Sequence, residues 1–149
     1  ATVSATPYQG YTFSGWSGAC SGTGQCVVTM NRHKTVTANF SLTPNATSYY
    51  NKGEEWYNAE NWVMAVEEFT NAIQVNPNYS NAYWYRGLSY DNLGQYKTAI
   101  NDYTKAIQLE PTAGRYNNRS FVYRDLGQWS LSAADEIKAC SMDKYYCNY

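Results

Sequence analysis

The side chains that most often carry out catalysis are scarce in this sequence. His33 is the only histidine among 149 residues, so neither a Ser–His nor a Cys–His pair can form within one protomer. The acidic pairs 54–55, 67–68 and 135–136 fall in helical patterns, where adjacent residues do not face each other. No phosphate-binding loop or dinucleotide fingerprint occurs. We therefore expect no enzymatic activity, no cofactor and no metal site.

Four cysteines form two closely spaced pairs. Cys20 and Cys26 enclose the glycine-rich segment 21–25, and a loop of this length can close a disulfide. A zinc site would need more ligands than His33 adds. We therefore expect a disulfide between Cys20 and Cys26, which implies an oxidising compartment.

The second pair, Cys140 and Cys147, lies at the end of the last helical pattern. In a continuous helix these residues would be about 10 Å apart, beyond the limit of about 7 Å for a bridge. A chain reversal at 144–146 would permit a bridge within the tail. We favour this bridge, and the alternatives are a bond between protomers or two free thiols.

The composition indicates a globular chain that is poor in charge. Charged residues make up 15%, against about 25% in a typical domain. The net charge of -1 argues against a nucleic-acid-binding protein, and no apolar run approaches the about 20 residues of a membrane span. The 16 tyrosines cannot all be buried with satisfied hydroxyls, so we expect several to face protein partners.

Charge and composition change near residue 44, which indicates two parts. Residues 1–44 carry only Arg32 and Lys34 as charged side chains. The remainder has 9 basic and 12 acidic residues. We place a β module at 1–42, a linker at 43–47 and a helical part at 48–143.

The first part alternates apolar and polar residues in four segments, which predicts strands. We expect strands near 2–6 and 11–13, and a hairpin of 27–30 with 35–40 around a turn at 31–34. A further turn is expected at 7–10. The expected core consists of Phe13, Trp16, Val28, Val36, Ala38 and Phe40.

The segment Gly10–Gly18, the cysteines at 20 and 26, and the closing strand Thr35–Phe40 resemble the divergent internalin-type B repeat of secreted bacterial surface proteins. The resemblance covers residues 1–41 and implies an extracellular β module without catalytic activity. Family members usually have a further strand before the position of Val3. Its absence predicts an incomplete module with an open edge, which is a pairing site for another chain.

The second part repeats itself with a period of about 34 residues. Residues 83–96 recur as 116–129, and an earlier copy starts near residue 46. The pattern resembles the tetratricopeptide repeat. The resemblance implies an all-α solenoid of three helix pairs, at about 46–79, 80–112 and 113–143. The third copy departs from the pattern, with Ser120 in place of glycine and Glu136 in place of the aromatic residue.

This resemblance also implies a concave groove lined by one face of each first helix, suited to a peptide or extended segment. The corresponding residues here are Tyr50, Glu54, Tyr57, Asn58, Asn81, Trp84, Leu88, Asp91, Asn92, Asn117, Phe121, Arg124 and Asp125. The alternative is that Leu88 and Phe121 are packed under a neighbouring helix. The residues that grip a terminal carboxylate in chaperone-binding members are not matched, because Tyr50 and Glu54 stand there.

Repeat proteins of this kind usually finish with an extra solvating helix, whereas only the aromatic tail 144–149 follows the third repeat. We therefore expect the end face, with Tyr145, Tyr146 and Tyr149, to contact another protomer. A head-to-tail contact that does not close generates a filament.

Three glycosylation sequons start at Asn45, Asn78 and Asn118, and we expect them to be unoccupied. The sequence as a whole predicts a secreted, non-enzymatic protein that binds other proteins. We expect it to self-assemble into a homo-oligomer or fibre. The alternative is a monomeric cell-envelope adaptor whose groove binds a partner's peptide.

Overall fold

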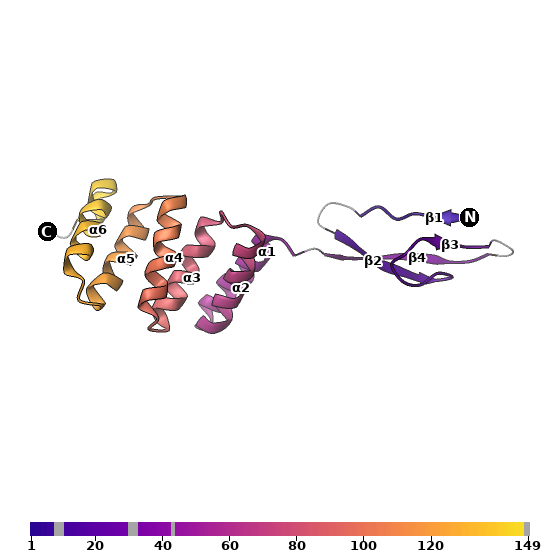
Figure 1. The fold of residues 1–149 in the computed structure, drawn as a ribbon, viewed down its shortest axis with the longest axis horizontal. Coiled ribbons are helices and arrows are strands. Elements are labelled where there is room, and N and C mark those ends of the chain that lie inside the picture. Colours follow the sequence, from indigo (N-terminus) through magenta and orange to yellow (C-terminus); the bar gives the residue numbers. More distant parts are fainter. Residues whose placement is uncertain (8–10, 30–32, 43, 148–149) are drawn as a thin grey trace. The chain divides into compact units, whose positions relative to one another are not determined.

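The computed structural model describes residues 1–7, 11–29, 33–42 and 44–147 (Figure 1). It divides into two compact units, Ala1–Asn45 and Ala46–Tyr149. Residues 8–10 of the predicted turn at 7–10, residues 31 and 32 of the predicted turn at 31–34, and Tyr149 lie outside the described residues.

The first unit contains two small antiparallel sheets. Strand β1 (Thr2–Val3) pairs with β3 (Cys26–Val27), and β2 (Tyr11–Gly18) pairs with β4 (Val36–Leu42). β1 is shorter than the alternation at 2–6 predicted.

The predicted hairpin between 27–30 and 35–40 is wrong. β4 pairs with β2, so that Phe13 lies opposite Phe40, while Val27 pairs with Thr2. The long pairing depends on a close approach at Gly18, where an added Cβ would lie 2.4 Å from the carbonyl oxygen of Thr35. Alternation identifies a strand by its faces, but it does not identify the strand's partner.

The core of this unit is small. Trp16, Cys26 and Val28 are buried, and Phe13 is among the half-buried residues packed against them. The Trp16 indole donates a hydrogen bond of 2.8 Å to the carbonyl oxygen of Gly24, which satisfies its polar end. Phe40 was expected in the core but is 40% exposed; its ring packs edge-to-face with the Phe13 ring, with centroids 5.9 Å apart.

The second unit consists of helices that follow one another in chain order (Figure 1). They are α1 (Ala46–Asn58), α2 (Trp62–Val75), α3 (Ser80–Asn92), α4 (Tyr96–Leu109), α5 (Ala113–Asp125), α6 (Trp129–Met142) and the short 3-10 helix η1 (Lys144–Tyr146). α1 packs on α2, α3 on α4 and α5 on α6, and α2 and α4 also pack on the following pair. The three predicted helix pairs are therefore present. α1 begins inside the segment that we assigned to the linker.

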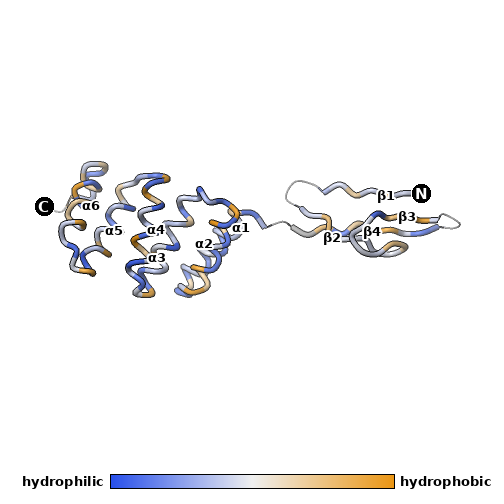
Figure 2. The backbone as a smooth tube through the Cα atoms, viewed as in Figure 1, coloured by the Kyte–Doolittle hydropathy of each residue, from blue (hydrophilic) through white to orange (hydrophobic). Residues whose placement is uncertain are grey.

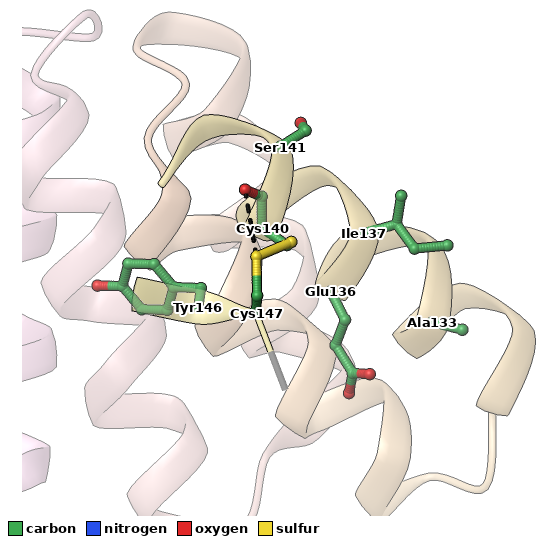
Figure 3. Close-up of a pocket in the computed structure, with 7 residues that line it drawn as sticks. All are labelled: Ala133, Glu136, Ile137, Cys140, Ser141, Tyr146 and Cys147. Carbon is green, nitrogen blue, oxygen red and sulfur yellow. Dashed lines mark hydrogen bonds between the residues drawn. A yellow bond between two sulfur atoms is a disulfide. The ribbon is translucent and has the colours of Figure 1, made fainter. Parts of the chain in front are cut away.

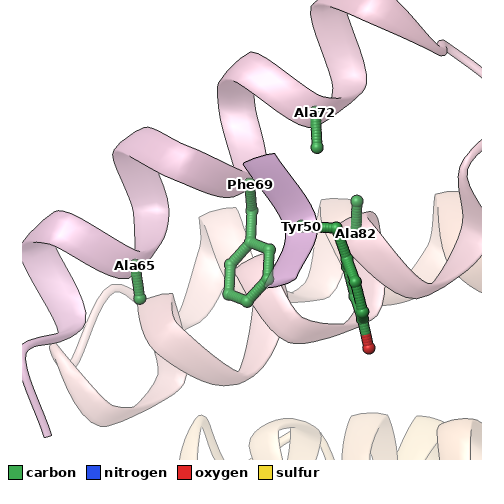
Figure 4. Close-up of a cluster of buried hydrophobic side chains, with 5 residues drawn as sticks. All are labelled: Tyr50, Ala65, Phe69, Ala72 and Ala82. Carbon is green, nitrogen blue, oxygen red and sulfur yellow. The ribbon is translucent and has the colours of Figure 1, made fainter. Parts of the chain in front are cut away.

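Apolar and polar residues are mixed along each helix (Figure 2). Small residues let them approach closely: Ala65, Ala72 and Ala82 are fully buried. Figure 4 shows these alanines around the rings of Tyr50 and Phe69, in a cluster formed by α1, α2 and α3. No helix among the described residues is long and apolar enough to cross a membrane.

A glycine in each of the first two pairs faces an aromatic ring. A Cβ on Gly53 would lie 2.6 Å from the Phe69 ring, and one on Gly87 would lie 2.9 Å from the Tyr103 ring. In the third pair Ser120 takes the glycine's position. A Cβ fits there because Glu136, rather than a ring, stands at the position of Phe69 and Tyr103.

Each helix pair also carries one ion pair at the same place. These pairs are Lys52–Glu68, Arg86–Asp102 and Arg119–Asp135, each with an N–O distance of 2.7 Å. Both arginines donate a further hydrogen bond to the preceding pair, Arg86 to Thr70 and Arg119 to Thr104. Arg86 and Arg119 therefore join neighbouring repeats as well as the two helices of their own repeat.

Candidate protein-binding surfaces

The predicted groove residues of α1 are largely taken up by packing. Tyr50 is 9% exposed, stacks on Tyr79 with centroids 5.0 Å apart and donates a hydrogen bond of 2.8 Å to Glu54. Burial, followed by this hydrogen bond, raises the pKa of Tyr50. Tyr57 meets the Tyr85 ring edge-on at 5.4 Å. Asn58, by contrast, is exposed.

The predicted groove residues of α3 behave similarly at its C-terminal half. Leu88 is half-buried and packs against the cluster around Tyr103, as the alternative interpretation proposed. Burial and then the charge of Asp125 raise the pKa of Asp91, which accepts a hydrogen bond from Tyr103. Asn92 is exposed and donates to the carbonyl oxygen of Leu88.

The corresponding residues of α5 are more open. Phe121 is 39% exposed, and the Arg124 guanidinium lies 4.6 Å from its ring centroid. Asp125 is exposed, whereas Asn117 is half-buried and its carbonyl oxygen accepts a hydrogen bond from Ser120. These side chains lack the following helix that covers Tyr50 and Leu88.

A pocket of about 480 Å³ lies at the N-terminal halves of α3 and α5. We call it the α3–α5 pocket. It is lined by Asn81, Trp84, Glu110, Thr112, Ala113, Gly114, Arg115, Asn118, Asp143 and Tyr146. The structure thus brings the predicted groove residues Asn81 and Trp84 together with Tyr146, which we had expected at an end interface.

Two rings and two amides define the walls of this pocket. The Trp84 indole donates a hydrogen bond of 3.4 Å to the side-chain oxygen of Asn118. The Tyr146 hydroxyl lies 3.3 Å from where a Cβ on Gly114 would stand. Gly114 occupies the repeat position of Asn81, and its missing side chain makes room for the Tyr146 hydroxyl beside α5.

Arg115 holds the loop before α5 in place. It is 3% exposed and donates hydrogen bonds to the side chains of Asn81 and Glu110 and to the Glu110 carbonyl oxygen. Its ion pair with Glu110 has an N–O distance of 3.0 Å. The guanidinium therefore fixes the shape of the pocket, and its charge is already paired.

Sequence reasoning missed seven of the lining residues: Glu110, Thr112, Ala113, Gly114, Arg115, Asn118 and Asp143. Asn118 appeared only as a sequon, although it follows the predicted Asn117 directly. Asp143 was missed because it follows α6 and reaches the pocket only when the tail folds back. The repeat period could have identified Gly114, because it stands 33 residues after the predicted groove residue Asn81.

The tail is held by the second disulfide. Cys140 and Cys147 are bonded with their Cα atoms 4.6 Å apart, because α6 ends at Met142 and the chain reverses through η1. Tyr146 is half-buried, whereas Tyr145 is 85% exposed. η1 contacts both α5 and α6, so the disulfide fixes one wall of the α3–α5 pocket.

Two known families match parts of the sequence. Residues 1–44 match the divergent InlB B-repeat domain, and residues 80–113 match the tetratricopeptide repeat. The chain joins a B-repeat module to a tetratricopeptide-repeat domain. A search of proteins with curated functions finds no match.

Solved structures similar to this chain are tetratricopeptide-repeat proteins. A crystal structure of MamA has a TM-score of 0.65 and 26% identity, and the match covers 70% of this chain and 62% of MamA. This chain thus spans less than two thirds of MamA. The Arabidopsis OM64 TPR domain has a TM-score of 0.65 and 25% identity, covering 67% of this chain and 84% of that domain.

The first TPR of Spaghetti (RPAP3), bound to the HSP90 peptide SRMEEVD, has a TM-score of 0.65 at 17% identity, covering 67% of this chain and 80% of that one. At this identity the likeness shows the fold alone. The tetratricopeptide fold is a protein-interaction scaffold and is typically not enzymatic. Both disulfides and the B-repeat module are features of an oxidising compartment.

A second exposed surface lies on α6 of the tetratricopeptide domain. Ile137 is 71% exposed and Trp129 is 66% exposed. Ile137 stands at the repeat position of Thr70 and Thr104, the residues that accept hydrogen bonds from the next repeat's arginine. Figure 3 shows Ile137 pointing away from the disulfide, beside a depression of about 400 Å³ that Ala133 also lines.

The remaining predicted sites are on the surface or in helices. His33 is exposed. Asn45 and Asn78 lie outside helices and strands, whereas Asn118 lies within α5. Among the described residues, no group of three His, Cys, Asp or Glu side chains could hold a metal ion.

Proposed function

We propose that this is an extracellular binding protein whose tetratricopeptide domain holds an extended segment of a partner protein in the α3–α5 pocket. The observation that carries the proposal is the pocket itself, where two rings lie beside two side-chain amides. The Nδ2 groups of Asn81 and Asn118 have no hydrogen-bond partner among the described residues, so they are available to the carbonyl groups of a peptide. The rings of Trp84 and Tyr146 offer apolar contact for its side chains.

The extracellular location is supported by the two disulfides, which account for all four cysteines, and by the B-repeat module. Disulfides persist in oxidising compartments. In this proposal the protein is an adaptor: the B-repeat module and the tetratricopeptide domain are two separate binding units on one chain, and neither performs catalysis.

The proposal is tested by selecting peptides from a displayed random library on the intact, oxidised protein. We expect Trp84→Ala and Asn118→Ala to weaken binding of the selected peptides at least about tenfold, since both side chains line the pocket. Trp129→Ala is the matched control, because it removes the same kind of ring from α6 and should leave binding unchanged. Selected peptides whose binding depends on Trp129 and not on Trp84 would contradict the proposal.

Self-association is the second candidate function, favoured by the exposed apolar residues of α6. A head-to-tail fibre of stacked solenoids would place α6 against α1, where Asn51, Lys52 and Glu55 are exposed. Polar side chains match the apolar face of α6 poorly, so we expect two α6 faces to meet each other.

Sedimentation velocity over a concentration series tests this second candidate. We expect Ile137→Lys to abolish association, because it would bury a charge in the interface. Val63→Lys is the control, since Val63 is 64% exposed on α2. A chain that stays monomeric well above micromolar concentrations, or that associates equally in both variants, would exclude α6 as the interface.

A further inference from the structure

The charged side chains that line the α3–α5 pocket differ in whether they already have an ion-pair partner. Arg115 is the cation among the lining residues, and both of its terminal nitrogens already donate to protein acceptors. Glu110 is its ion-pair partner. Asp143 is exposed and has no cationic partner in the pocket; one of its oxygens accepts a hydrogen bond of 2.9 Å from the Tyr145 backbone.

The first turn of α5 also faces this pocket, and the N-terminus of a helix attracts anions. Here two carboxylates already line that end, those of Glu110 and Asp143. Lys144 follows Asp143 in the chain but is not among the lining residues. A further carboxylate from a ligand would therefore meet negative charge at the place where a helix end would otherwise favour it.

The wider predicted groove also carries more negative than positive charge. Glu54, Asp91 and Asp125 stand on it against one basic residue, Arg124, whose guanidinium lies over the Phe121 ring. Tyr146 also lines the pocket, and aromatic faces attract ammonium and guanidinium groups. The Trp84 ring, by contrast, already has the Arg115 guanidinium 5.9 Å from its centroid.

We propose that the α3–α5 pocket selects an extended segment of a partner protein that presents a lysine or arginine side chain to Asp143, and that it disfavours segments that present a carboxylate side chain there. This inference rests on the proposed function and names the chemistry of its partner. The partner's backbone would meet the amides of Asn81 and Asn118, and its cationic side chain would lie between the Asp143 carboxylate and the Tyr146 ring.

Fluorescence anisotropy with the intact, oxidised chain tests this selection. The probes are three labelled pools of short amidated peptides that share a randomised Ala/Ser/Tyr/Leu frame and differ only in a central Lys, Gln or Glu. We expect affinity to fall in the order Lys, Gln, Glu, and the Lys pool alone to weaken as salt is raised.

Asp143→Asn should lower the affinity for the Lys pool by about two- to fivefold and leave the Gln pool unchanged. Asparagine retains the oxygen that accepts from the Tyr145 backbone, so the tail keeps its fold. Glu67→Gln is the control, because it removes the same charge from an exposed residue of α2 and should have no effect.

Different experimental results would contradict this inference and the proposed function. If the Glu pool binds as tightly as the Lys pool or more tightly, and its binding still depends on Trp84 and Asn118, the charge selection is wrong but the pocket remains the binding site. A Lys preference that persists in Asp143→Asn would overturn the role of Asp143. If no pool shows binding that depends on Trp84 or Asn118, the pocket is not the binding site and both proposals are wrong.

Discussion

The two disulfides of this protein close loops of almost equal length but hold regions that differ in kind. Cys20 and Cys26 are separated by 6 positions and Cys140 and Cys147 by 7. Loop-closure entropy alone would assign each a stabilisation of about 2–3 kcal/mol. Their consequences nevertheless differ, because the noncovalent contacts around them differ.

Cys26 belongs to the buried core of the B-repeat module, which consists of three buried residues and a few half-buried neighbours. Cys140 and Cys147 lie at the end of a domain whose contacts recur from repeat to repeat. Stability in the module is concentrated at one place, whereas stability in the tetratricopeptide domain is distributed. The predictions below test this difference, starting with the largest expected effect.

Replacing both Cys20 and Cys26 by serine should unfold the B-repeat module, because a unit of this size without its staple cannot offset its conformational entropy. A two-dimensional amide NMR spectrum should lose the dispersed signals of residues 1–42 and keep those of the helices. Retention of the module's dispersed signals would show that its small core is sufficient without the bond.

Gly53→Ala should destabilise the tetratricopeptide domain by about 1–3 kcal/mol, because its Cβ would lie 2.6 Å from the buried Phe69 ring. Urea unfolding followed by circular dichroism measures this loss. Ser120→Ala is the matched control in the third repeat, with an expected change within about 1 kcal/mol. Equal losses in the two variants would contradict the role of the ring.

Replacing Cys140 and Cys147 by serine should leave the six helices folded and lower global stability by about 1–2 kcal/mol. Hydrogen exchange should increase selectively in residues 143–147, because this segment then depends on the few contacts of η1 with α5 and α6. Peptide binding in the α3–α5 pocket should weaken as well, because Tyr146 is one of its walls. Exchange that rises throughout α5 and α6 would show that this disulfide supports the domain, not only the tail.

Glu60→Gly should stabilise the domain slightly, by about 0.5–1 kcal/mol. Glu60 has a positive φ of 57°, and the equivalent positions of the other repeats are Gly94 and Gly127, with φ values of 71° and 70°. A left-handed conformation costs a side-chain-bearing residue energy that glycine avoids. The melting temperature measures the gain, and Gly94→Glu should lower it by a similar amount.

The contacts that recur in each helix pair could be predicted from the sequence far better than the pairing of individual strands. The spacing of Gly53 and Gly87, with aromatic residues sixteen positions later, reflects contacts within one helix pair, so local sequence was sufficient to identify the repeats. The B-repeat strands were recognised individually, but β4 was assigned the wrong partner. Strand pairing depends on residues far apart in the chain, such as Gly18 and Thr35, and alternation carries no information about them.

The candidate site was predicted only in part for a related reason. The resemblance to the tetratricopeptide repeat placed Asn81 and Trp84 on the face of α3 that lines the α3–α5 pocket. It also selected Tyr50, which the structure buries among rings of α2, α3 and the loop before α3, because burial depends on which neighbouring side chains are large enough to cover a position. Tyr79 and Tyr85 provide that cover here.

The sequence by itself determined the two-part architecture, the helical repeat and the cysteine pair of the B-repeat module, because each is encoded by residues close together in the chain. Only the tertiary structure decided the strand pairing, the burial of Tyr50 and the return of the tail to α5. Asp143 and Tyr146 line the same pocket as Trp84 although they lie almost two repeats later in the chain. Their arrival there depends on the packing of all the helices between them, and no local pattern records it.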